Sequence, residues 1–149
     1  MRIFGSLCFA DRMTELGELS TMDAAEQLAT LSGQTRAKLE QWKLQRWGED
    51  EPAYGAFRAI GVAIASKRAP PSIAEMKALF AFAERLLRHG SGEVSNMVAT
   101  GTLEAIWAAA HESGFDFKIV NPHLGPEARR YLLAWDQFNE TSTVGLTGR

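Results

Sequence analysis

The sequence predicts an all-α domain, because helix start and stop signals divide most of the chain and apolar residues recur at helical spacing between them. Its 149 residues match the commonest domain size, and 46% hydrophobic with 23% charged residues is typical of a globular protein. We expect five or six antiparallel helices joined by short links, with a two-layer, HEAT-like stack as the candidate arrangement. No repeat of fixed period is present, so a true solenoid is not established.

The helical domain is expected to span residues 21–140. Residues 1–20 form a poorly defined N-terminal segment, whose apolar run 3–10 is short and lacks a small-x-small cleavage site, so a signal peptide is disfavoured. Residues 141–149 are expected to form a tail that lies on the surface or is loose. No run reaches the roughly 18 apolar residues that a membrane-spanning helix requires.

Three helices are predicted in the first half. Residues 20–23, with Ser20 at the start, have capping-box spacing, and Gly33 is expected to end the helix that follows. A second helix should run from about Thr35 to Trp47 and end at Gly48. Pro52 suits the first position of a third helix, over about residues 51–67.

The second half begins with the clearest helix start. Ser72 and Glu75 form a capping box, and the helix after them should end at His89 and Gly90. From about residue 92 to 112, apolar residues occur all around the helical circumference, which is typical of a central helix. After an extended connection, Gly-Pro-Glu at residues 125–127 predicts the start of the final helix.

Charge and cysteine content exclude several classes of function. The formal net charge is −2 and the charges are spread nearly evenly, which argues against a nucleic-acid binder. Cys8 is the only cysteine, so neither an intramolecular disulfide nor a thiolate zinc cluster is expected, and a reducing cytoplasm fits best. His89, His111 and His123 lack the short spacings of a zinc site. We therefore expect no metal and no cofactor.

Two charged residues fall on apolar or central helix faces. Arg58 lies inside the apolar arc of the third helix, and its head must either extend to solvent or meet a carboxylate. Glu104 is our first candidate for a structural polar pair with Arg58, and Glu84 is the substitute partner. Glu104 also belongs to a semi-polar stripe of the central helix, formed by Asn96, Thr100, Glu104, Trp107 and His111.

No catalytic signature stands out from these residues. The segment HGSGE, residues 89–93, lacks G-x-S-x-G spacing and lies between helices rather than after a strand. Glu104 and His111 lie two turns apart, about 10 Å along the axis, which is too far for direct proton transfer. We therefore predict a protein that is not an enzyme.

The final helix divides into a core stripe and a flank. The stripe consists of Ala128, Tyr131, Leu132, Trp135 and Phe138, which predicts Trp135 as a core anchor. The flank, about 110 degrees from the centre of the stripe, consists of Arg129, Leu133, Asp136 and Glu140. A leucine surrounded by charges is common at interfaces and also occurs on ordinary surfaces. We expect this flank to be a partner-binding patch.

Two blocks of the C-terminal half carry a family resemblance. FAFAERLLRHGSGEVSNMVATGTLEAIW, residues 80–107, is followed by LGPEARRYLLAWDQF and then by Gly145 and Leu146. This part resembles a family of small bacterial helical proteins, the immunity proteins of toxin–immunity pairs. The specific elements are the acidic residue Glu84, the Leu103–Glu104 pair and the helix beginning with LGP and containing Trp135–Asp136.

The resemblance implies an α-helical, cytoplasmic binding protein without catalytic residues. Such a protein neutralises a cognate toxin domain by covering its active site or its target-binding surface, and it needs neither a nucleic acid nor a membrane. The competing interpretation is a small helical scaffold or regulatory module that binds a cellular protein, or a second copy of itself as a homodimer. An enzyme of unrecognised type ranks third.

Overall fold

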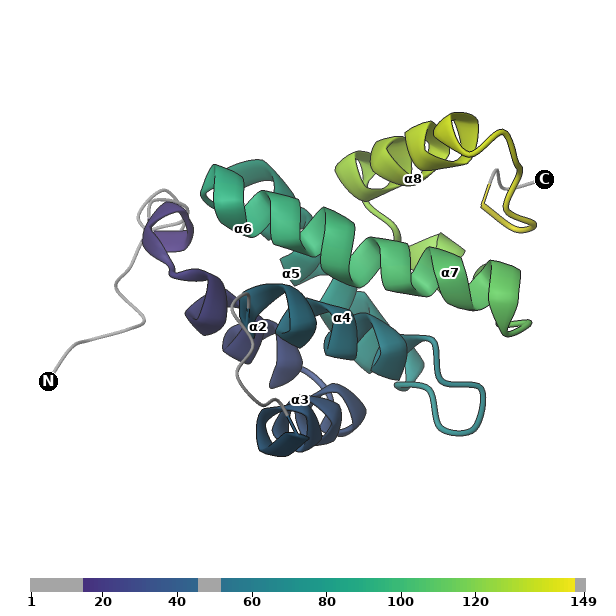
Figure 1. Cartoon of the computed structure of the whole chain (residues 1–149). Helices are drawn as coiled ribbons and strands as arrows, with labels where there is room; N and C mark the ends of the chain where they lie inside the picture. The colour runs from purple at the N-terminus through teal and green to yellow at the C-terminus, as the bar shows by residue number, and fades with distance from the viewer. Residues whose placement is uncertain (1–14, 46–51, 147–149) are drawn as a thin grey trace, which may run out of the picture.

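A computed structural model describes residues 15–45 and 52–146, and this part of the chain contains helices and no strand. The all-α prediction is confirmed. Figure 1 shows the arrangement of the elements. In chain order they are α2 (Thr21–Ala29), α3 (Gly33–Gln45), α4 (Pro52–Ile64), α5 (Ile73–His89), α6 (Gly92–Met97), the π-helical segment η2 (Val98–Leu103), α7 (Glu104–Glu112), the 3-10 turns η3 (Phe117–Ile119) and η4 (Asn121–His123), and α8 (Pro126–Phe138).

The predicted start of α5 is confirmed in full. Ser72 Oγ accepts a hydrogen bond from Glu75 N at 3.1 Å, and the Glu75 carboxylate accepts one from Ser72 N at 2.9 Å. The two bonds satisfy backbone donors that have no partner within the helix. The amide bond that Glu75 accepts from Ser72 lowers the pKa of its carboxyl.

The boundary between α2 and α3 differs from the prediction. Gly33 begins α3 instead of ending α2, which ends at Ala29. Ser32 Oγ accepts a hydrogen bond from Thr35 N at 3.0 Å and so caps the new helix. Thr35 Oγ1 donates to Ala29 O at 2.7 Å and closes the turn between the two helices. Ser32 as an N-cap was therefore a stronger signal for the start of a helix than Gly33 was for the end of one.

The helix expected over residues 92–112 is present as one rod, formed by α6, η2 and α7 (Figure 1). The residues at both ends of η2 keep right-handed helical dihedrals, so the rod continues through the π-helical segment. The chain nevertheless contains more helical segments than the five or six expected.

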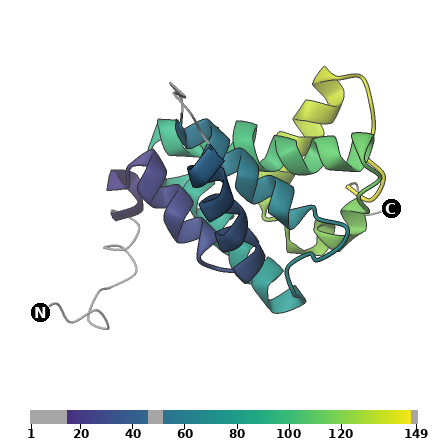
Figure 2. The same cartoon turned by 60° about the horizontal axis from the view of Figure 1, so that its bottom comes forward.

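Helix α4 lies at the centre, with α3 on one side and the rod on the other (Figures 1 and 2). Two glycines allow α4 and the rod to approach closely. A Cβ atom on Gly61 would lie 2.5 Å from Thr102 O, and one on Gly101 would lie 2.7 Å from Phe57 Cβ. At the same crossing Thr102 Oγ1 donates a hydrogen bond to Phe57 O at 2.7 Å.

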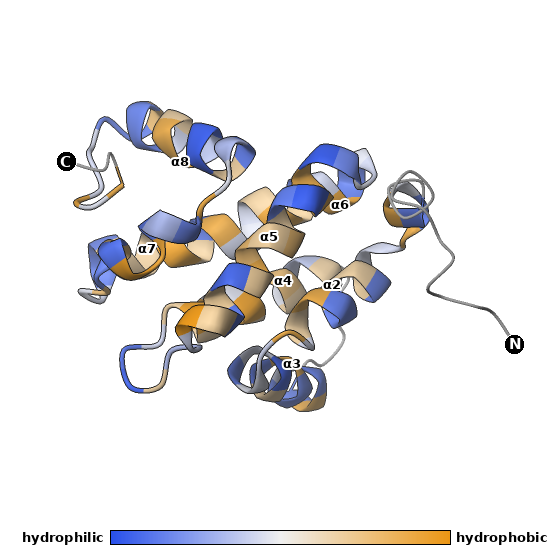
Figure 3. Cartoon of the chain, turned by 180° about the vertical axis from the view of Figure 1, so that it is seen from behind, coloured by the Kyte–Doolittle hydropathy of each residue, from blue (hydrophilic) through white to orange (hydrophobic). Residues whose placement is uncertain are grey.

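The hydrophobic core draws on every helix around α4. Its largest fully buried side chains include Leu28, Leu39, Phe57, Ile60, Met76, Phe80, Leu86, Leu103, Ile106 and Phe117. Figure 3 shows the hydrophobic colour concentrated on α4, α5 and parts of the rod, whereas α3 is mainly hydrophilic. Helix α3 thus packs on α4 as an outer element with a large solvent-exposed face.

Both ends of the described chain belong to the packed domain. Leu16 is part of the core, so the domain begins before residue 21. Thr143 and Leu146 are buried, so of the two alternatives expected after residue 140, residues 141–146 lie against the domain and are not a loose tail. Cys8 and the predicted helix end at Trp47 and Gly48 lie outside the described residues. Within residues 15–45 and 52–146, no helix combines the length and apolarity needed to cross a bilayer.

Candidate functional site

The start of α8 is held by an acidic residue from another helix. Gly125 is the N-cap residue and offers no side chain, but Glu84 of α5 accepts hydrogen bonds from Glu127 N at 2.7 Å and Ala128 N at 3.1 Å. A carboxylate is favourable there because the helix dipole is positive at its N-terminus. Arg88 Nε donates to the same carboxylate at 3.2 Å. A Cβ atom on Gly125 would overlap the Glu84 side chain, so this position requires glycine.

We expect Glu84→Ala to lower the free energy of unfolding by about 1–2 kcal/mol, because it leaves two amides of α8 without their acceptor. The Glu84 side chain is only 12% exposed, so water cannot fully replace the carboxylate. Urea denaturation measures the effect. Glu18→Ala, at an exposed residue, is the control and should change the free energy by less than about 0.5 kcal/mol. Equal losses in the two variants would contradict this role for Glu84.

The middle of α8 is joined to the rod by a second acidic residue. Tyr131 Oη donates a short hydrogen bond to the Glu104 carboxylate. Burial of the phenol raises the Tyr131 pKa above its usual value, and the bond to Glu104 raises it further. Glu104 is therefore explained as an α8-facing residue of the rod.

The predicted pair of Arg58 and Glu104 is not formed. Glu104 faces Tyr131 of α8, whereas Arg58 is exposed and lines a groove between α3 and α7 on the other side of the rod. No hydrogen bond or ion pair joins the two described side chains, and Glu84 is occupied at the start of α8. The guanidinium reaches solvent, the alternative that the sequence left open.

The raised Tyr131 pKa predicts a stability loss at alkaline pH. The folded state holds the phenolic proton more tightly than the unfolded state, so this stabilisation is complete below pH 10 and is lost as the pH rises through the folded pKa. Between pH 9 and 11, the free energy of unfolding of the wild type should fall by about 1 kcal/mol more than that of Tyr131→Phe. The difference is smaller than for a fully buried phenol, because solvent screens the half-buried ring. Urea midpoints across this range measure the difference, and parallel pH profiles would contradict it.

The C-terminal part of α8 is organised by Asp136, which is 5% exposed. Its carboxylate accepts hydrogen bonds from Trp107 Nε1 at 2.7 Å, Thr143 N at 2.8 Å and Thr143 Oγ1 at 2.7 Å. His111 Nε2 lies 2.8 Å from Thr143 Oγ1 and 3.9 Å from Asp136 Oδ1. The hydroxyl proton of Thr143 is directed to Asp136, so His111 Nε2 is the donor to Thr143. Asp136 thus connects α8 to α7 and to the C-terminal segment.

This network contains an acid, a histidine and a hydroxyl, but its geometry differs from that of a hydrolase triad. In a triad the acid contacts Nδ1 of the histidine and the hydroxyl contacts Nε2. Here Asp136 and Thr143 both lie on the Nε2 side of His111, and both are buried. The arrangement stabilises the junction of three segments and leaves no free hydroxyl facing a substrate space.

These contacts contradict the predicted partner-binding patch on the flank of α8 for two of its four residues. Asp136 is buried, and Arg129 donates hydrogen bonds to Asn121 Oδ1 at 2.7 Å, Asn121 O at 3.0 Å and Leu146 O at 2.8 Å. Both residues therefore hold the fold together. Only Leu133, 40% exposed, and the exposed Glu140 remain available on that flank.

The opposite edge of α8 carries a row of aromatic rings. Tyr131 stacks on Trp135 with ring centroids 6.3 Å apart, and Trp135 stacks on Phe138 at 5.4 Å. Trp107 of α7 meets Trp135 edge-on at 6.1 Å and lies 4.3 Å from the His111 ring. Phe138 is 76% exposed at the end of this row. We call Trp107, Tyr131, Trp135 and Phe138 the aromatic ridge.

Trp135 is not the core anchor that the sequence predicted. It is half-buried and its ring contacts are with the other members of the ridge and not with the main core. The buried positions of α8 are Ala128, Leu132 and Asp136, which recur every four residues. The inward face of α8 is therefore turned away from Trp135 and toward Asp136, which reverses the predicted roles of these two neighbours.

A family model matches residues 23–140, from α2 to the end of α8, and its description is "Domain of unknown function" (DUF7674). The chain belongs to the DUF7674 family. A search of curated proteins and a search of solved structures found no match. The matched span of this DUF7674 domain contains Glu84, Glu104 and Asp136, the three acidic residues that hold α8.

Sequence reasoning missed two features of the DUF7674 domain. The first is the donor set around Asp136, because Trp107 and Thr143 are 29 and 7 residues away and no local spacing connects them. The second is the capping of α8 by Glu84, 43 residues before Glu127. A weak signal existed, because Gly125 as N-cap supplies no acceptor and the α8 amides therefore required one from elsewhere.

Proposed function

We propose that this DUF7674 domain is a protein-binding module of the immunity type, which neutralises a cognate toxin domain by direct contact through the aromatic ridge. The exposed end of the ridge is the observation that supports the proposal. Phe138 presents most of its ring to solvent beside the half-buried Trp135. Exposed aromatic side chains of this kind are the usual energetic anchors of protein interfaces.

The ridge is also held in a fixed orientation, which favours tight binding. Glu84 fixes the start of α8, Glu104 fixes Tyr131, and Asp136 fixes the end of α8 against Trp107. A partner that docks on the ridge would not need to order this helix first, and less binding free energy would be lost to conformational entropy.

Steric cover of the toxin is the proposed mode of action. A domain that docks aromatic anchors beside a toxin's active site or target-binding surface would block access without chemistry of its own. The two-layer, HEAT-like stack belongs to the same proposal, because stacked helix pairs form extended surfaces suited to protein recognition. The resemblance to immunity proteins supports this direction, since its three acidic motif residues all act on the helix that carries the ridge.

The test is co-expression with the product of the neighbouring gene, which the proposal expects to contain the toxin domain. A pull-down should recover the two proteins together, and the DUF7674 domain should restore growth of cells that express the toxin. Absence of both binding and rescue would reject the immunity proposal. Binding to a non-toxic cellular protein would favour the scaffold interpretation instead.

Phe138→Ser should weaken binding of the toxin domain by about 30-fold, the effect of losing a hot-spot residue worth about 2 kcal/mol. The melting temperature should stay nearly unchanged, because most of the ring is already in solvent. Ile73→Ser is the matched control, since Ile73 is 75% exposed and lies at the start of α5. Calorimetric titration of both variants measures the difference. Equal affinities of wild type and Phe138→Ser would contradict a role for the ridge.

A further inference from the structure

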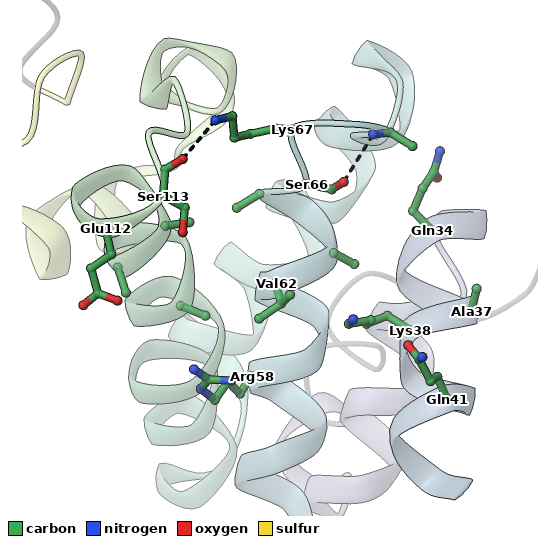
Figure 4. A pocket seen from close by; sticks show the side chains of 16 residues that line it. Gln34, Ala37, Lys38, Gln41, Arg58, Val62, Ser66, Lys67, Glu112 and Ser113 are labelled. Carbon is green, nitrogen blue, oxygen red and sulfur yellow. Dashed lines mark hydrogen bonds between the residues drawn. The ribbon is translucent and has the colours of Figure 1, made fainter. Parts of the chain in front are cut away.

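A second surface lies on the other side of α7. A groove of about 800 Å³ runs over α4 between α3 and α7, and we call it the α4 groove. Figure 4 shows α4 along its floor, with residues of α3 and α7 on either side. The residues that decide its chemistry are Gln34, Lys38, Arg58, Lys67 and Glu112.

Small side chains line most of the α4 groove. Seven alanines contribute, from α3, from α4 and the segment after it, and from α7: Ala37, Ala63, Ala65, Ala69, Ala105, Ala108 and Ala109. Short side chains at a contact allow two helices to approach toward the lower end of the usual 8–10 Å between axes. A further helix could therefore pack closely into the groove between α3 and α7.

The charges of the α4 groove are predominantly positive. Lys38, Arg58 and Lys67 line it, against the single carboxylate of Glu112. Lys67 Nζ donates to Ser113 O at 3.1 Å, whereas Lys38 and Arg58 have no hydrogen bond or ion pair with any described residue. Both side chains extend into the groove in Figure 4. This positive surface lies on a chain of net charge −2, so it marks a local preference for an anionic partner.

A buried polar atom in the wall of the groove lacks a partner. Gln34 Oε1 is buried and accepts no hydrogen bond from the described residues. An unpaired buried acceptor is costly, but the Gln34 side chain would have to rotate before a donor on an occupant could reach this oxygen. The groove therefore offers two cations, Lys38 and Arg58, that the described residues leave unpaired.

We propose that the α4 groove binds an acidic amphipathic helix of a partner protein. Its carboxylates would face Arg58 and Lys38, and its apolar side would lie against the small side chains that line the groove. A helix fits better than a small anion because the cations are spread along an open trough over α4. The site is separate from the aromatic ridge, since α7 turns Trp107 toward α8 and its alanines toward the groove.

A synthetic alanine-based helix with a stripe of leucines flanked by glutamates is the probe, and the same peptide with lysines in place of glutamates is its control. In an NMR titration of the full chain, the glutamate peptide should shift the amide resonances of Ala105, Ala108 and Ala109, and the lysine peptide should not. Arg58→Glu should weaken binding at least tenfold. Arg36→Glu, which changes the net charge equally on the outward side of α3, should leave binding within twofold.

Three results would overturn the proposal. These are shifts confined to other surfaces, an equal loss of affinity in Arg58→Glu and Arg36→Glu, or complete displacement of the peptide by an equal concentration of inorganic phosphate, which would indicate a small-anion site. Phe138→Ser should bind the peptide as the wild type does. Failure of toxin binding through the ridge and failure of peptide binding in the groove are therefore separate outcomes.

Discussion

Replacing Asp136 with alanine should lower the free energy of unfolding by about 3–5 kcal/mol, the order expected when several hydrogen bonds to a buried carboxylate are lost. The substitution deletes three hydrogen bonds and leaves the Trp107 indole N–H and the Thr143 amide without an acceptor. It also removes one of the contacts that hold the C-terminal segment against α8. The sequence prediction places Asp136 in a surface patch for partner binding, where its replacement would leave stability nearly unchanged.

Urea denaturation of Asp136→Ala measures this loss. Gln137→Ala is the matched control, because Gln137 is the next residue on the same helix and its side chain is exposed. The control should change the free energy by less than about 0.5 kcal/mol. A loss below about 1 kcal/mol in Asp136→Ala would show that the network contributes little to the fold.

Gly61→Ala should destabilise the domain by about 1–3 kcal/mol, although alanine is the better helix former by about 1 kcal/mol. The added Cβ would lie 2.5 Å from Thr102 O and 2.8 Å from Ala105 Cβ. The first of these atoms belongs to the backbone of the rod, which cannot move aside as a flexible side chain would. The crossing of α4 with the rod must therefore open, and the hydrogen bond from Thr102 to Phe57 O lengthens with it.

Replacing Gly92 with alanine should not destabilise the domain. Gly92 lies in the first turn of α6 and a Cβ atom there would meet nothing within 4 Å. Gly92→Ala should leave stability unchanged or raise it by up to about 1 kcal/mol. Thermal melts of the two variants test the packing of α4 against the rod. A stabilised Gly61→Ala would contradict the close crossing.

Local signals in the sequence were sufficient for most helix positions. Ser72 with Glu75 placed α5, and Gly125 with Pro126 placed α8, because caps act within one helical turn. The apolar circumference of residues 92–112 predicted one long helix there correctly, but the central position belongs to α4, and Ile106 is the single buried residue of α7. The π-helical segment η2 was not predictable, because its Gly101 and Thr102 meet Phe57 and Gly61 of α4, and that crossing joins residues far apart in the chain.

The roles of Trp135 and Asp136 were reversed for a physical reason. A helical wheel assigns an aspartate outward because burying a carboxylate without partners is costly. The partners exist, but they come from Trp107 and from the segment after α8. With Asp136 satisfied inside, α8 rotates its aromatic edge toward solvent, and Trp135 with Phe138 becomes surface.

The motifs behind the family resemblance gain a physical meaning from these contacts. Glu84, Glu104 and Asp136 stand on three different helices, yet each contributes to the position of α8. Sequence motifs around them therefore describe how one helix is held and which edge it exposes. The aromatic edge is the proposed binding surface, and the three acidic residues hold the helix that carries it.

Hydrogen exchange of the indole N–H groups tests this division between buried acid and exposed ridge most directly. The Trp107 indole donates to Asp136, whereas the Trp135 indole has no acceptor among the described residues. NMR spectra assigned with Trp107→Phe and Trp135→Phe should show slow exchange for Trp107 and fast exchange for Trp135, and Asp136→Ala, which removes the acceptor, should remove much of the protection of Trp107. Fast exchange of Trp107 in the wild type, or stronger protection of Trp135, would contradict the account.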